Sequence, residues 1–201
     1  MRTKLKILVL IILSSFGVNA QNIIYDFGAS TSASLMTSDY DFVLGVGIKL
    51  DNRISLRSTN FSLKSSIGHT KYNNTDITES QKKDYDNLWM LDIMLEYDLF
   101  YIDKKSLTTI TKNWTPYIGV GPNIIYRSND GGSEFATIKG SLGIKKRLSN
   151  NLLFIAEGYL EWDFCDELDG NGNSHPNWKH YDHTANFAIG LCYRFSSTPT
   201  K

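Results

Sequence analysis

The stretch from Trp114 to Arg127 constrains the fold of this chain most, because its side chains change character at every second position. Its even-numbered positions are mostly apolar, with an aromatic residue near each end, and its odd-numbered positions are mostly small or polar. A period of two predicts a β-strand with one apolar face. A tilted strand of this length rises roughly 30 Å, the height of a bilayer's apolar band. The pattern therefore predicts a strand that crosses a membrane.

Pro122 lies in the middle of this predicted strand. A proline has no amide hydrogen and cannot donate to a neighbouring strand. We therefore expect either a local bulge or a weakened bond at this position.

Eight alternating runs of this kind cover the chain, with no linker rich in Pro, Gly or Ser between them. They are Asn22–Met36, Tyr40–Leu50, Arg53–Tyr72, Leu88–Tyr101, Trp114–Arg127, Phe135–Leu148, Leu152–Cys165 and His183–Phe195. The pair Asp51–Asn52 reads as a tight turn, and so does Ser149–Asn151. In Arg53–Tyr72 the apolar side chains change from even-numbered to odd-numbered positions, which we interpret as a bulge near Ser58 to Asn60. The chain is thus predicted to be all-β, an eight-stranded antiparallel up-and-down barrel.

A soluble barrel of lipocalin type would share this alternation, so other features must distinguish the two. The polar face is rich in small residues and mixes both charges, which suits a narrow lumen better than a solvated surface. The outward aromatic residues form two groups, as in the girdles of membrane barrels. One group is Phe42, Trp89, Tyr126, Trp162 and Phe164, and the other is Tyr25, Tyr101, Trp114, Tyr193 and Phe195.

Residues 1–20 are expected to be a cleaved signal peptide, with Arg2, Lys4 and Lys6 before a short apolar run and Val18–Ala20 at the cleavage site. Residues 21–201 then form one barrel domain in the outer membrane of a Gram-negative bacterium. The chain has 21 basic and 21 acidic residues, so no net charge favours nucleic acid.

Eight strands enclose room only for side chains, so we expect little conduction. A lumen charge ladder is predicted, in which Lys139 lies opposite or beside Glu161 and Glu157, with Arg127 and Arg194 further along the lumen. Its simplest role is to hold the register of the strands. The two cysteines, Cys165 and Cys192, fall at opposite ends of their strands, so two free thiols are expected.

With both termini in the periplasm, the segment from Ile102 to Asn113 faces inward. It is long for a periplasmic turn and carries Lys104, Lys105 and Lys112, which makes it either a solvated loop or a docking surface.

The outer loop Asp166–Asp182 imitates half of a calcium loop but has Trp178 where a bidentate Glu belongs. Three histidines lie in or directly after this loop: His175, His180 and His183. Ser174 beside them has no recognisable nucleophile setting. We expect a polar loop without metal, cofactor or catalysis.

Two segments, YDLFYIDKKSLTTITKNWTPYIGVG and GSLGIKKRLSNNLLFIAEGYLEWDFCDELDG, carry a resemblance. They contain a strand that ends in a Phe–Tyr pair and a strand in which TPY is followed by two glycines. They also contain a hairpin with the sequence GIKKRLSNN and, after it, the acidic segment DFCDELDG. In these features the chain resembles the PorG-like outer-membrane barrels associated with the type IX secretion system of Bacteroidetes. The resemblance covers about Leu88 to Gly170. The last strand, with Gly190, Tyr193 and Phe195, also looks like the signal that the barrel assembly machinery reads.

The resemblance implies a non-enzymatic, structural barrel in outer-membrane lipid that ties periplasmic ring proteins of the secretion system to the membrane. A second hypothesis is a small surface barrel of the OmpA/OmpX type that binds external partners through its outer loops. A lipid-modifying enzyme that uses the three histidines is the third and least favoured.

Overall fold

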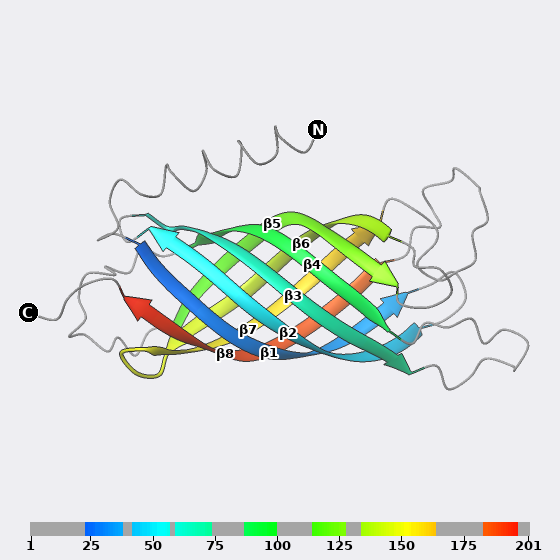
Figure 1. Cartoon of the computed structure of the whole chain (residues 1–201), viewed down its shortest axis with the longest axis horizontal. Coiled ribbons are helices and arrows are strands. Elements are labelled where there is room, and N and C mark those ends of the chain that lie inside the picture. The colour runs from blue at the N-terminus through cyan, green and yellow to red at the C-terminus, as the bar shows by residue number, and fades with distance from the viewer. Residues whose placement is uncertain are drawn as a thin grey trace, which may run out of the picture.

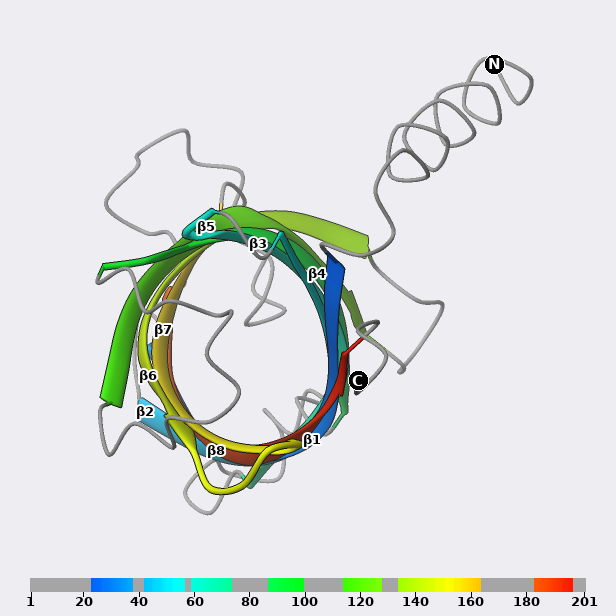
Figure 2. The ribbon, with the colours of Figure 1, turned by 90° about the vertical axis from the view of Figure 1, so that its left-hand side faces the viewer.

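The computed structural model describes residues 23–37, 42–56, 59–73, 87–99, 114–127, 134–163 and 183–196. These residues form eight antiparallel strands in a closed barrel, in which each strand pairs with its neighbours in the chain and β8 pairs with β1 (Figures 1 and 2). The strands are β1 (Ile23–Thr37), β2 (Phe42–Leu56), β3 (Phe61–Asn73), β4 (Leu88–Asp98), β5 (Trp114–Arg127), β6 (Glu134–Arg147), β7 (Leu152–Asp163) and β8 (His183–Ser196). The predicted up-and-down barrel of eight strands is confirmed.

The side chains alternate between the outer face and the lumen along every strand, as the period of two requires. The outer face is apolar, and Ile48 in the middle of β2 exposes 68% of its surface. The lumen is charged, and Lys139 of β6 exposes none. In water this arrangement would leave apolar area uncovered around the whole wall. Hydrocarbon is the surrounding medium in which it is stable.

The predicted turn at Asp51–Asn52 is wrong. β2 continues through both residues to Leu56, with Asp51 buried in the lumen and Asn52 exposed on the outer face. The connection to β3 lies between Leu56 and Phe61, where the Thr59 amide donates to the Leu56 carbonyl. A turn at this point changes the parity of the apolar side chains just as a bulge would. The predicted bulge near Ser58 to Asn60 is therefore the β2–β3 turn.

The predicted turn at Ser149–Asn151 is confirmed, because β6 and β7 pair on both sides of it and Leu148 donates to the Leu152 carbonyl. The β2–β3 turn lies at the same end of the barrel, where β1 begins and β8 ends. We call this end the short-turn rim and the opposite end the far rim (Figure 1). Short turns face the periplasm in bacterial outer-membrane barrels, which makes the far rim the outer one.

Pro122 interrupts pairing on one side of β5 only. The β4–β5 register runs from Leu88 opposite Arg127 to Asp98 opposite Tyr117, but it skips Ile93 and Met94 on β4 and Gly121 and Pro122 on β5. Pairing of Pro122 with Ile138 of β6 continues. The register is the same before and after the gap, so there is no extra residue. Of the two expected outcomes, the ladder is weakened and no bulge forms.

Aromatic side chains lie on the outer face near both rims. Trp89 and Tyr126 are register partners near the far rim, and Tyr25 and Phe195 are register partners near the short-turn rim. All four expose more than a third of their surface. Phe42, Tyr101 and Phe164 fall outside the side chains that the structure describes.

The predicted signal peptide, residues 1–20, also lies outside the described residues. Within the part of the chain that is described, no helix is long and apolar enough to cross a membrane.

Candidate functional site

The lumen holds a network of buried ion pairs that crosses the barrel. Its centre is Lys64 of β3, whose Nζ lies 2.6 Å from Oε2 of Glu157 on β7. Lys64 also lies 3.9 Å from carboxylate oxygens of both Asp51 and Glu96. β3 and β7 are on opposite sides of a ring of eight strands, so the Lys64–Glu157 pair spans the whole lumen.

A second group of ion pairs lies between Lys64 and the short-turn rim. The Arg53 guanidinium donates two hydrogen bonds to Glu96, of 2.6 and 2.8 Å. Lys145 of β6 lies 3.0 Å from Glu96 and 2.7 Å from Asp98. The aromatic ring of Tyr117 faces this group, with Lys145 Nζ 4.3 Å from its centroid. Arg53 and Lys145 therefore both contact the carboxylate of Glu96, which links β2, β4 and β6.

A third group lies on the far-rim side of Lys64. Lys139 of β6 donates to Asp92 of β4 at 2.6 Å and lies 3.6 Å from Glu161 of β7. Glu161 also accepts hydrogen bonds from Asn123 at 3.2 Å and Thr184 at 2.6 Å. Each carboxylate in this group is thus held by more than one donor, as buried charges require.

Lys49 of β2 occupies the space between these groups. Its Nζ lies 3.8 Å from Glu157 Oε2 and 4.3 Å from the ring centroid of Tyr159. It makes no hydrogen bond to the part of the chain that the structure describes. The Lys49 ammonium is therefore stabilised by the nearby carboxylate of Glu157 and by the aromatic face of Tyr159.

Apolar side chains lie on both sides of the network around Lys64. On the short-turn side the buried cluster is Tyr117, Leu153, Ile155 and Cys192. On the far-rim side, buried apolar or aromatic residues that face the lumen are Met36, Tyr72, Leu88, Met90 and Ile125. The low dielectric of such layers strengthens the attraction between paired charges and raises the cost of an unpaired one. The site as a whole fills and braces the lumen.

The structure brings together only some of the residues of the predicted lumen charge ladder. Lys139 and Glu161 are register partners, but Glu157 is paired with Lys64 and not with Lys139. Arg194 forms its two hydrogen bonds with Asp26 near the short-turn rim, at 2.7 and 2.8 Å. The side chain of Arg127 lies outside those described.

Gly190, Tyr193 and Phe195 of the predicted assembly signal lie on β8. Tyr193 and Phe195 are exposed on the outer face with ring centroids 4.8 Å apart. A Cβ on Gly190 would lie 2.6 Å from Ala29 O and Ser30 Cβ, so β1 and β8 meet closely at that position. Residues 102–113, with Lys104, Lys105 and Lys112, and residues 166–182, with His175 and His180, lie outside the described residues.

Sequence reasoning missed Lys64 and Arg53, which join most of the network. Both lie in the stretch Arg53–Tyr72, for which the sequence predicts one run with a bulge. The sequence pattern therefore did not show that both side chains face the lumen. The alternation of Ser62, Lys64, Ser66, Gly68 and Thr70 on the lumen face was the signal that could have located the strand correctly.

Cys192 is a free, buried cysteine on the lumen face, whereas Cys165 is outside the described residues. Two free thiols therefore stay a prediction. Among the described residues, no group of three His, Cys, Asp or Glu side chains is placed to hold a metal ion.

A closed antiparallel wall, an apolar outer surface and a charged, filled lumen together define a class: this is a small eight-stranded outer-membrane β-barrel. The chain is similar in structure to Neisserial surface protein A (NspA), with a TM-score of 0.62 and 11% identity over 85% of this chain and 97% of that one. It is also similar to Ail of Yersinia pestis, solved in complex with the heparin analogue sucrose octasulfate, with a TM-score of 0.50 and 10% identity over 87% and 99% of the two chains. At such identities the likeness concerns the fold. No protein-family model and no curated protein sequence matches the chain.

Proposed function

We propose that this protein is a non-conducting, non-catalytic barrel that anchors partner-binding segments in the outer membrane. The observation that carries the proposal is the ion pair between Lys64 and Glu157, which spans the lumen from one wall to the other. Solute or ion flow would require this buried pair and the apolar layers on both sides of it to separate. Breaking a buried pair costs about 3–5 kcal/mol.

Planar bilayer recordings test the absence of conduction. The reconstituted protein is expected to give no stepwise current at voltages at which a general porin conducts in the same chamber. The double variant Lys64→Ser/Glu157→Ser removes the side chains that cross the lumen, and serves as the matched sample in which small currents are expected. Regular single-channel steps from the unmodified protein would refute the proposal.

For the partner, we propose a periplasmic component of a secretion apparatus, as the resemblance to PorG-like barrels implies. The connection between β4 and β5 supports this choice. β4 ends at Asp98 and β5 begins at Trp114 on the short-turn rim, whereas β2–β3 and β6–β7 are joined there by four residues each, 57–60 and 148–151. A longer, lysine-bearing segment at this rim offers a surface to partners below the membrane.

Cross-linking in intact cells tests the docking role. The triple variant Lys104→Ala/Lys105→Ala/Lys112→Ala is expected to lose periplasmic ring proteins that the unmodified barrel captures. The triple variant Lys82→Ala/Lys83→Ala/Lys179→Ala removes the same charge from the connections at the far rim and is expected to retain them. Equal capture by both variants would exclude this segment as the docking surface.

A second candidate is a surface barrel that binds external partners through its outer connections. The structural likeness to Ail, a barrel solved with a bound sulfated sugar, supports considering it. Replacing residues 166–182 with a short Gly–Ser turn is expected to abolish binding of the external partner and leave periplasmic cross-links unchanged. Loss of the periplasmic cross-links alone in the lysine variant would favour the first candidate.

A further inference from the structure

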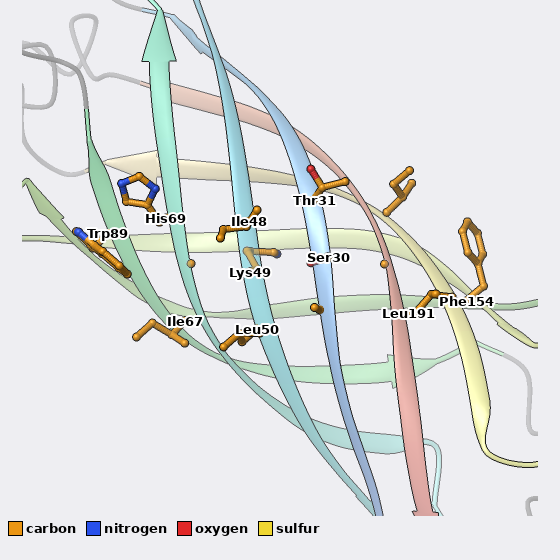
Figure 3. Close-up of a pocket in the computed structure, with 14 residues that line it drawn as sticks. Ser30, Thr31, Ile48, Lys49, Leu50, Ile67, His69, Trp89, Phe154 and Leu191 are labelled. Carbon is orange, nitrogen blue, oxygen red and sulfur yellow. The ribbon is translucent and has the colours of Figure 1, made fainter.

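The outer wall contains a hollow where the apolar surface would otherwise be even. It has a volume of about 1030 Å³ and lies over β8, β1, β2 and β3, with Trp89 at one side and Phe154 at the other (Figure 3). On β1 the outward-facing residues here are Ala29 and Thr31, and Ala33 follows on the same face towards the far rim. Their short side chains leave a valley along β1.

Bulky side chains form a ridge on each side of this valley. On β2, Ile48 and Leu50 lie opposite Thr31 and Ala29, and on β8, Ile189 and Leu191 do the same. From Ala29 to Ala33 the valley extends for about 13 Å at the rise of a β-strand. Its length suits one extended acyl chain, and the lining of the hollow is almost entirely apolar.

A positively charged side chain lies just beyond the far-rim edge of the hollow. His69 of β3 contacts Trp89 with ring centroids 4.8 Å apart, and Lys71 is exposed at the next outward position of the same strand. In the half of the barrel next to the far rim, Lys71 is the one lysine or arginine among the outward-facing side chains that the structure describes. Lys71 lies two residues from the far-rim end of β3, and a cation beside an apolar valley near the end of a strand attracts an acidic lipid.

The far rim is the outer one, so the lipid in contact with this site belongs to the outer leaflet. We propose that the valley along β1 is a binding site for lipid A, with one acyl chain over Ala29, Thr31 and Ala33 and a phosphate held by Lys71. The site lies on the wall and is separate from the connecting segments of the proposed function. Its failure would leave that function unaffected.

Native mass spectrometry of the mature protein tests the proposal, after reconstitution in vesicles and release in mild detergent. Vesicles contain phosphatidylethanolamine with equal amounts of lipid A, dephosphorylated lipid A or phosphatidylglycerol. The unmodified protein is expected to retain lipid A about fivefold more than dephosphorylated lipid A, the effect of one lysine at a membrane surface. It is also expected to retain lipid A more than phosphatidylglycerol, which has one phosphate where lipid A has two. Retention of lipid A equal to that of either other lipid would overturn the proposal.

Two variants locate the site, and each has a matched control. Ala29→Phe fills the valley, and Ala136→Phe places the same side chain on the outer face of β6. Lys71→Ala removes the cation, and Lys146→Ala removes one near the short-turn rim. Ala29→Phe and Lys71→Ala are each expected to reduce lipid A retention about fivefold, and the controls are expected to have no effect.

If Ala29→Phe does not fold, as judged by heat-modifiable gel migration, Ala33→Leu fills the same valley with a smaller side chain. Unchanged retention in Lys71→Ala, or equal losses in a variant and its control, would overturn the proposal.

Discussion

Lys64 and Glu157 are separated by 93 residues in the chain, yet their charged atoms lie 2.6 Å apart across the lumen. Each side chain is at most 4% exposed. The pair joins opposite walls of the barrel, and Lys49, Asp51 and Glu96 surround it within 4 Å of one partner or the other. The stability of the closed ring therefore depends on charge pairing as well as on strand pairing.

Removing one partner of this pair is expected to destabilise the barrel strongly. Lys64→Met leaves Glu157 buried with only the more distant Lys49, and the free energy of unfolding should fall by about 3–5 kcal/mol. The double variant Lys64→Met/Glu157→Met removes both charges of this pair and leaves Lys49 against the ring of Tyr159; it should be more stable than Lys64→Met. Urea unfolding in detergent micelles, followed by tryptophan fluorescence, measures both. A double variant less stable than the single one would contradict the pairing.

Ile48 tests the medium around the barrel. It lies near the middle of β2 and is 68% exposed on the outer face. In a bilayer, Ile48→Lys should cost about 2–4 kcal/mol because the charge enters hydrocarbon. Asn52→Lys on the same strand and face, nearer the short-turn rim, should cost less than about 1 kcal/mol. Unfolding in lipid vesicles compares the two, and equal costs would indicate that the wall does not face lipid.

Gly121 is expected to tolerate no side chain. A Cβ there would lie 2.0 Å from the Ile93 carbonyl oxygen and 2.7 Å from Met94 Cα, so the backbone of β4 would have to move. Gly121→Ala should reduce the free energy of unfolding by about 3 kcal/mol, the upper end for overpacking. Gly158→Ala is the control, because its nearest atoms would be 3.9 Å away. The control should change stability by less than about 0.5 kcal/mol.

Cys192 is expected to be unreactive while the barrel is folded. It is 3% exposed and packs with Tyr117, Leu153 and Ile155. In a Cys165→Ser background, a maleimide reagent should label Cys192 only after urea unfolding. Adding Asn150→Cys at the exposed β6–β7 turn should give immediate labelling of one thiol. Rapid labelling of Cys192 in the folded protein would mean that the short-turn end of the lumen is open.

The fold follows from local patterns because a barrel wall is built from neighbours in the chain. Alternation identifies the two faces of each strand, and the turn at Ser149–Asn151 sets the register of β6 and β7. The error at Asp51–Asn52 has a physical cause. Both a turn residue and a lumen residue are polar, so the type of residue alone does not distinguish them. The pairing of Asp51 with Gly28 of β1 and with Ser66 of β3 shows that β2 continues.

The sequence by itself determined that this protein has eight membrane-crossing strands, one apolar face on each, and charges on the inner face. Only the tertiary structure decided which charges meet: Lys139 with Asp92, Glu157 with Lys64, Arg194 with Asp26. The reason is that a period of two fixes the side of the wall on which a side chain lies. Its partner across the lumen depends on the closure of the ring and the stagger of strands that are not adjacent in the chain.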